Sequence, residues 1–269
     1  GPGPGAAAAG SGLLTALAAA AAVAYCNATS SARLAARYPQ SGGTYVYGRE
    51  RLGEFWGYLA GWSFVVGKMA SCAAMALTVG LYVWPAHAHS VAVAAVAGLT
   101  AVNYRGIQKS ALLTRVIVTV VLAVLAGVVV AVLLSGRAEA ARINLTGGTP
   151  AGVLQAAGLL FFAFAGYARI ATLGEEVRDP AHTIPRAIRI SLAFTLMVYA
   201  VLAVVLTAIL GPELRTAAAP LAEAVRAAGF GWLDPVVRVG AAVAALGSLL
   251  SLILGVSRTG LAMDRDGHL

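Results

Sequence analysis

The sequence predicts an all-α membrane protein, a bundle of helices that crosses the bilayer several times. Hydrophobic residues make up 59% of the chain and charged residues only 11%, and the mean hydropathy is +0.82. Because soluble domains carry roughly 25% charged residues, this composition excludes an ordinary water-soluble domain. The apolar residues form long runs rather than an alternating pattern. This arrangement favours transmembrane helices over a transmembrane β-barrel.

Seven stretches are long and apolar enough to cross a membrane, a task that needs ~20 mostly apolar residues. Lys68 interrupts the second stretch, and the third is the weakest of the seven. The seven predicted spans, treated as one transmembrane domain, are residues 10–32, 55–84, 87–104, 116–134, 151–173, 190–210 and 239–257.

The basic residues between the spans predict the orientation of the chain. Thirteen of them fall on one side of the membrane and five on the other, with Lys68 inside a span. Loops that are rich in Lys and Arg stay in the cytoplasm, so the side with thirteen is expected to be cytoplasmic. The net charge of +8 is therefore explained by membrane orientation, and we expect no nucleic-acid partner.

This orientation places the first residue outside the cell. The chain begins with Gly1 rather than Met and shows no charged region of a signal peptide. We therefore expect a helix upstream of these residues, which would make the chain an internal fragment of a longer transporter-like protein. The alternative is a natural seven-helix protein with an external N-terminus.

The fifth span holds the candidate site. Residues 159–185 begin as an apolar helix with three phenylalanines, reach Gly166 and then Arg169, and end in an acidic pair and an Asp-Pro turn. A helix that glycine loosens inside a membrane can expose backbone carbonyls and amides to a polar substrate. In the alternative interpretation, Gly166 only lets two helices approach closely and Arg169 extends to the cytoplasmic surface.

Charged residues near the spans are further candidates. Lys68 lies within a span, where insertion costs ~2.5–3.5 kcal/mol, so it is expected to face the protein interior or water. It could titrate protons or replace a coupling cation, or it could form a static interior contact that locks helices. Glu175 and Glu176 could act as a cytoplasmic gate by pairing with basic residues in one state, or they could be ordinary charges at a helix end.

Enzyme and metal-site motifs are absent from the sequence. It contains no nucleotide-binding glycine loop, zinc-binding HExxH, CxxC pair or GxSxG sequence. His87 and His89 alone are too few ligands for a metal site. We therefore expect no catalytic residue, no metal site and no cofactor, and a protein that is not an enzyme.

Three segments together resemble the amino acid–polyamine–organocation (APC) family of transporters. FFAFAGYARIATLGEEVRDPAHTIPRAI (161–188) is similar to the sixth helix of that family and the loop after it. ARYPQSGGTYVYGRERLGEFWGYLAGW (36–62) is similar to the link between its second and third helices. SRTGLAMDRDGHL (257–269) is similar to the end of its eighth helix. The match covers essentially the whole chain, as a fragment from about the second helix to the eighth.

The resemblance implies about twelve helices in an inverted five-plus-five repeat, the LeuT-like transporter fold. It also implies a site at the broken sixth helix. Carbonyls of Phe164, Ala165 and Gly166 would bind the substrate amine, and Phe162 would stack on the substrate or gate it. Tyr167 and Ala168 would line the lower edge of the pocket. The glycine motif of the first helix, which should hold the substrate carboxylate, is not among these residues.

One departure from the family concerns coupling. Some relatives carry a lysine in the fifth helix whose ammonium replaces a coupling sodium, whereas the corresponding place near Val121 has no lysine. Lys68 is the candidate to substitute for it.

The expected function is secondary active transport of amino acids across the cytoplasmic membrane by alternating access, as a proton symporter. The apolar, fairly small pocket favours neutral amino acids over diamines. A polyamine or cationic amino acid carrier, or an exchanger, is the alternative within transport. A non-transporting membrane fragment or scaffold is the alternative outside it.

Overall fold

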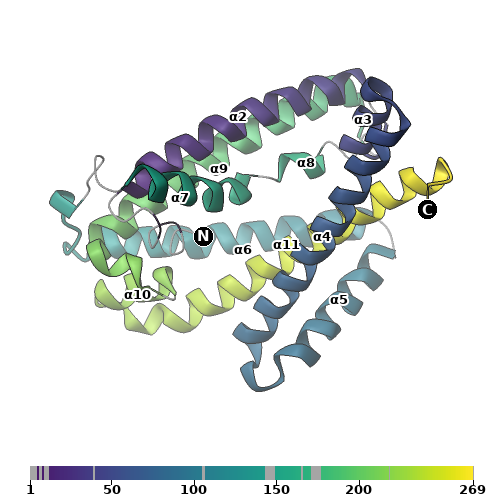
Figure 1. The fold of residues 1–269 in the computed structure, drawn as a ribbon. Coiled ribbons are helices and arrows are strands. Elements are labelled where there is room, and N and C mark those ends of the chain that lie inside the picture. Colours follow the sequence, from purple (N-terminus) through teal and green to yellow (C-terminus); the bar gives the residue numbers. More distant parts are fainter. Residues whose placement is uncertain are drawn as a thin grey trace. The chain divides into compact units, whose positions relative to one another are not determined.

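The computed structural model describes residues 5, 8, 12–38, 40–104, 107–142, 149–164, 166–170, 177–217 and 219–268. Within these ranges the chain consists of helices and connections, with no strand (Figure 1). Six of the helical segments are long and apolar enough to cross a membrane. The prediction of an all-α, multi-pass membrane fold is confirmed.

The elements follow one another along the chain in a simple order. The α-helices are α2 (Leu13–Arg37), α3 (Thr44–Leu52), α4 (Glu54–Val83), α5 (Ala88–Tyr104), α6 (Ile107–Leu134), α7 (Pro150–Phe164), α8 (Tyr167–Ile170), α9 (Pro180–Leu210), α10 (Pro220–Ala227) and α11 (Asp234–Arg265). Short 3-10 helices lie at Pro85–His87, Ala140–Arg142, Gly211–Arg215 and Gly231–Leu233.

The fifth predicted span differs from a continuous membrane helix. Instead of one helix over 151–173, α7 ends at Phe164 and the four-residue α8 begins at Tyr167. The apolar helix there is shorter than the six spanning ones. Glycine costs about 1 kcal/mol relative to alanine inside a helix, so a stop beside Gly166 agrees with local propensity.

The sixth predicted span is preceded by more helix than expected. Pro180 opens α9, where proline fits because the first helical residue needs no N–H partner. Asp179 adopts a left-handed φ of 49° and its carbonyl accepts the Thr183 N–H at 2.9 Å. Aspartate tolerates this conformation better than most residues do. Helix α9 therefore starts ten residues before the apolar run at 190.

The chain forms two compact units, with boundaries that fall inside α2, α6, α8, α9 and α11. Unit 1 comprises residues 1–30, 124–167 and 188–237, and unit 2 comprises residues 31–123, 168–187 and 238–269.

Unit 1 is built on close packing of α2 along α9, with α7 against both (Figure 1). Ala16, Ala20 and Ala24 are at most 1% exposed and recur at every fourth position, so they form one face of α2. Small residues at this spacing let helix backbones approach closely in a membrane. Leu160 of α7 and Leu206 of α9 fill the space opposite this face.

Unit 2 contains a tight corner between α3 and α4. Gly53, with a left-handed φ of 100°, is the single residue between the two helices. A Cβ on Gly48 would lie 3.1 Å from the Cα of Gly57. A Cβ on Gly57 would in turn lie 2.8 Å from the Arg49 backbone. Because neither glycine has a side chain, the backbones of α3 and α4 can come into direct contact here.

The rest of unit 2 packs α4 against α5 and α11. Ala76 of α4, Ala92 of α5 and Leu249 of α11 belong to one buried apolar cluster. At the α4–α5 turn, a Cβ on Gly80 would collide with the carbonyl oxygen of Ala88. Glycine is therefore required where α5 folds back onto α4.

Candidate functional site at the interrupted helix

The break between α7 and α8 is the local feature on which the candidate site depends. Helix α7 ends at Phe164, Gly166 lies in a turn, and α8 begins at Tyr167. The last four carbonyls of a helix lack an intrahelical partner, and in α7 they belong to residues 161–164. Such carbonyls at membrane depth are tolerated where they are buried in protein or line a water-filled cavity.

Phe164 anchors the end of α7 by its side chain. The residue is 3% exposed, and its ring centroid lies 5.6 Å from that of Tyr199 on α9. The side chain therefore belongs to the core of unit 1. Its backbone carbonyl is one of the last four of α7. The binding of a substrate amine by this carbonyl stays a prediction.

Gly166 does not serve a close helix approach among the residues that the structure describes. It is exposed, and no described heavy atom lies within 4 Å of the position that a Cβ would occupy. The interpretation of Gly166 as a packing residue therefore has no support in that part of the chain. The role of Gly166 in a broken helix stays a prediction.

The other predicted site residues are placed only in part. Tyr167 and Ala168 begin α8 and are both half-buried, and Ala168 is the first residue of a unit 2 segment. The backbone of Phe162 lies in α7, but its side chain is outside the described part. Ala165, Glu175 and Glu176 lie outside the described residues.

Lys68 lies on α4 in unit 2 and is half-buried. Its Nζ is 5.5 Å from the ring centroid of Phe64, one helical turn earlier. A cation over an aromatic ring gains roughly 0.5–2 kcal/mol, which offsets part of the cost of a charge within a span. The role of Lys68 in coupling stays a prediction.

A polar cluster that the sequence interpretation missed joins α3 to the end of α11. The Tyr45 hydroxyl donates to Asp266 Oδ2 at 2.6 Å, and Arg49 Nη1 donates to the same oxygen. His268 Nδ1 lies 2.9 Å from the Tyr45 hydroxyl. Because the single hydroxyl hydrogen is directed to Asp266, His268 must be the donor in that contact.

The C-terminal end of α11 has the geometry of a Schellman motif, which positions Asp266 and His268. Gly267 is left-handed with φ 72°. Its N–H bonds to the Asp264 carbonyl, and the His268 N–H bonds to the Met263 carbonyl, both at 2.9 Å. The sequence held one indication of this cluster: Tyr45 and Asp266 lie in two of the segments that resemble the family.

The cluster shifts the pKa values of both acidic partners. Burial, followed by the hydrogen bond to Asp266, raises the pKa of Tyr45 to about 12. The hydrogen bond from Tyr45 and then the Arg49 guanidinium lower the pKa of Asp266 below its usual 3.8. A lowered carboxyl pKa contributes stability that is present above the unfolded-state value and is lost as pH falls through the folded-state value.

Replacing Asp266 with asparagine is expected to destabilise the protein by about 1–2 kcal/mol at pH 7, because it removes charge-assisted hydrogen bonds. As the pH falls from 5 to 3, the variant should also lose less stability than the unmodified protein does. Thermal unfolding in detergent across this range measures both effects. Asp179→Asn is the matched control, since Asp179 pairs with His182 at 3.1 Å in an exposed position. Equal effects of the two variants would argue against a stabilising cluster.

Comparison with known proteins identifies the family. The family model described as "Amino acid permease" matches residues 2–269. The chain belongs to the amino acid permease family. The resemblance predicted from the three segments is therefore confirmed, and so is the prediction of a transporter rather than an enzyme.

The relatives of this permease are membrane transporters. An uncharacterized transporter of Mycobacterium tuberculosis is 74% identical over 250 residues, which cover 91% of this chain and 56% of the relative. A branched-chain amino acid permease of Bacillus subtilis is 27% identical, covering 89% of this chain and 57% of the relative. The human cationic amino acid transporter 4 is 26% identical, covering 88% and 41% respectively. The match thus covers between 41% and 57% of the length of these relatives.

Proposed function

We propose that this permease moves amino acids across the cell membrane by secondary active transport, through alternating access. The substrate is held at the break between α7 and α8. The observation that carries the proposal is the end of α7 at Phe164, which leaves four carbonyls without intrahelical partners inside an apolar stretch. A substrate ammonium can donate hydrogen bonds to carbonyls at the end of a helix, whereas lipid cannot.

The residues around the break favour a neutral amino acid. Residues 150–170 contain no carboxylate and are mostly aromatic or small. A cationic side chain would need a nearby acidic partner, since an unpaired charge is costly away from water. The relative named as a branched-chain amino acid permease supports this class, and the one named as a cationic amino acid transporter supports the alternative.

For either substrate, Glu175 and Glu176 are proposed as a cytoplasmic gate.

Proton coupling is the second part of the proposal, and Lys68 is its candidate residue. Lys68 is half-buried on α4, which is long and apolar enough to cross the membrane, so its ammonium is a titratable group placed within a span. A proton taken up on one side of the membrane and released on the other would couple transport to the proton gradient. The cation–π contact with Phe64 would hold the charged form in place.

Uptake into liposomes tests both parts. The protein is expressed from its complete reading frame, reconstituted, and given a panel of labelled neutral, cationic and acidic amino acids, with putrescine as the polyamine probe. We expect uptake of neutral amino acids that an inward proton gradient stimulates. Lys68→Ala should lose this stimulation while keeping exchange between internal and external substrate. A Lys68→Ala variant with unchanged pH dependence would remove Lys68 from coupling.

The other outcomes separate the alternatives. Uptake that ignores the gradient but requires internal amino acid would indicate an exchanger. Uptake confined to arginine, lysine or putrescine would favour the cationic or polyamine carrier. Absence of uptake for every probe, with a folded protein in the bilayer, would favour a non-transporting role.

A further inference from the structure

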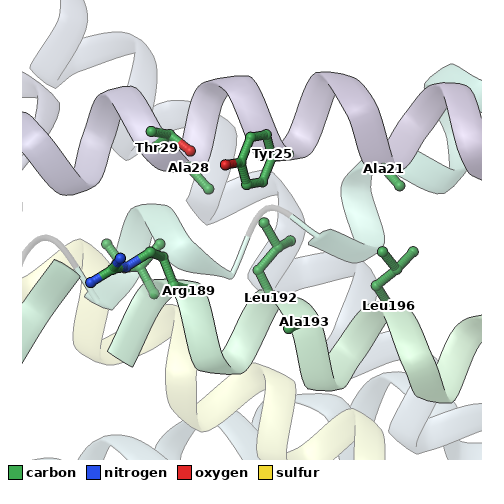
Figure 2. Close-up of a pocket in the computed structure, with 9 residues that line it drawn as sticks. Ala21, Tyr25, Ala28, Thr29, Arg189, Leu192, Ala193 and Leu196 are labelled. Atoms are coloured by element: carbon green, nitrogen blue, oxygen red, sulfur yellow. The ribbon is translucent and has the colours of Figure 1, made fainter. Parts of the chain in front are cut away.

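A groove between α2 and α9 in unit 1 has no role in the proposed function. It has a cavity volume of about 210 Å³ and is lined by residues from both helices. Figure 2 shows its two ends: Thr29 lies near Arg189 at one, and Ala21 lies near Leu196 at the other. Between them, Tyr25 of α2 stands over Leu192 of α9.

The groove exists because small residues adjoin the tightly packed face of α2. Alanines at positions 21 and 193 leave space that the neighbouring leucines do not fill (Figure 2). Tyr25 is 61% exposed although it lies in the middle of a membrane-spanning helix. Both helices are long and apolar enough to cross a membrane, so the groove lies within the membrane-spanning part of unit 1.

Thr29 and Arg189 lie at one end of the groove, and Tyr25 lies between the two ends. Helix α9 begins at Pro180, so Arg189 lies about two and a half turns into it at 3.6 residues per turn. The orientation predicted from the basic residues places this end on the cytoplasmic side. From Arg189 to Leu196 the groove is apolar along α9 for roughly 10 Å, at a rise of 1.5 Å per residue.

We propose that the groove binds one anionic phospholipid. An acyl chain lies against Leu192 and Leu196, and the lipid phosphate meets the Arg189 guanidinium. Arg189 is the only charged residue among the described residues that line the groove, so the charge there complements an anionic head group. Basic sites between membrane helices on the cytoplasmic side are suited to such lipids.

The chemistry of the lining residues supports a phosphate rather than a carboxylate or a sterol. A guanidinium matches phosphate geometry through two parallel N–H donors. It carries five donors in all, so another contact does not prevent it from binding a lipid. The hydroxyls of Tyr25 and Thr29 line the same groove and can each donate one further hydrogen bond. A volume of this size fits part of one acyl chain rather than a folded ligand.

Lipid retention by the full-length protein tests the proposal. The protein is delipidated in detergent, incubated with phosphatidylglycerol or phosphatidylcholine, and examined by native mass spectrometry. We expect one tightly retained phosphatidylglycerol, and weaker phosphatidylcholine binding. Arg189→Gln should lower the affinity for phosphatidylglycerol about tenfold, to the level of phosphatidylcholine. Ala193→Phe should fill the groove and lower the retention of both lipids.

Two matched variants make the result specific. Arg186→Gln removes an exposed arginine one turn earlier on α9 that does not line the groove. Val201→Phe enlarges a residue of α9 that is 42% exposed and also lies outside the groove. Both should retain phosphatidylglycerol as the unmodified protein does. Equal losses for Arg189→Gln and Arg186→Gln would show general attraction to basic residues and overturn the proposal.

Two further results would also overturn it. Ala193→Phe that keeps full lipid retention would show that the lipid binds elsewhere. A change in the oligomeric mass with Ala193→Phe, without loss of lipid, would assign the groove to a contact with a second copy. Because residues 189 and 193 are exposed, both variants should fold, and circular dichroism verifies this before lipid is added. If Ala193→Phe fails that check, Ala193→Leu takes its place.

Discussion

Replacing Gly166 with leucine is expected to reduce amino acid uptake at least tenfold without unfolding the protein. Glycine is less favourable than alanine in a helix by about 0.8–1 kcal/mol and leucine ranks close to alanine, so leucine favours continuation of α7 through the break. This difference alone shifts the population about fourfold, since 1.4 kcal/mol corresponds to a factor of ten. The leucine side chain then adds bulk beside the carbonyls proposed to bind the substrate.

The structure indicates that the variant can fold. Apart from its chain neighbours, no described residue places a heavy atom within 4 Å of the Cβ position at Gly166. Thermal unfolding in detergent should therefore stay within about 0.5 kcal/mol of the unmodified protein, as for exposed substitutions in general. Uptake and thermal unfolding must be measured on the same preparation. A loss of uptake without a loss of stability is the result that assigns Gly166 to function.

Gly158→Leu is the matched control for this prediction. Gly158 lies in the same helix, is exposed, and also has no described atom within 4 Å of its Cβ position. Since it lies inside α7 rather than at the break, leucine there should leave uptake unchanged. Equal loss in both variants would show that bulk on α7 matters rather than the break. Full uptake by Gly166→Leu would move the substrate site away from this glycine.

Gly57→Leu is expected to have the largest effect on stability. A Cβ at this position would lie 2.6 Å from the Arg49 Cβ and 2.8 Å from the Arg49 backbone. Separations this short cannot be relieved by a flexible side chain, so α3 must move away from α4. Overpacking costs 1–3 kcal/mol and sometimes more, and we expect about 3 kcal/mol here because backbone is involved.

Gly67→Leu is the control for the second prediction. Gly67 lies on the same helix, and among the described residues nothing approaches its Cβ position within 4 Å. Leucine there should leave the unfolding midpoint unchanged or raise it slightly, through better helix propensity. The midpoints of both variants are measured in the same detergent. A Gly57→Leu protein as stable as Gly67→Leu would contradict the close contact between α3 and α4.

Local sequence patterns predict both the membrane helices and the break in α7. Apolar runs alone predict membrane helices, because a helix is the way a single segment can satisfy all its backbone groups in lipid. The break beside Gly166 was also predictable, since glycine weakens a helix through its own backbone entropy. Both properties depend on residues that are close neighbours along the chain.

The sequence by itself therefore determined the all-α, multi-pass fold, and Gly166 marked where α7 would stop. Only the tertiary structure decided which side chains meet across long separations. Tyr45 and Asp266 are more than two hundred residues apart, and nothing in either local pattern shows that they share a hydrogen bond. The α2–α9 groove likewise results from alanines whose small size matters only beside a second helix. Such contacts depend on which helix faces are brought together, and hydropathy alone does not specify that choice.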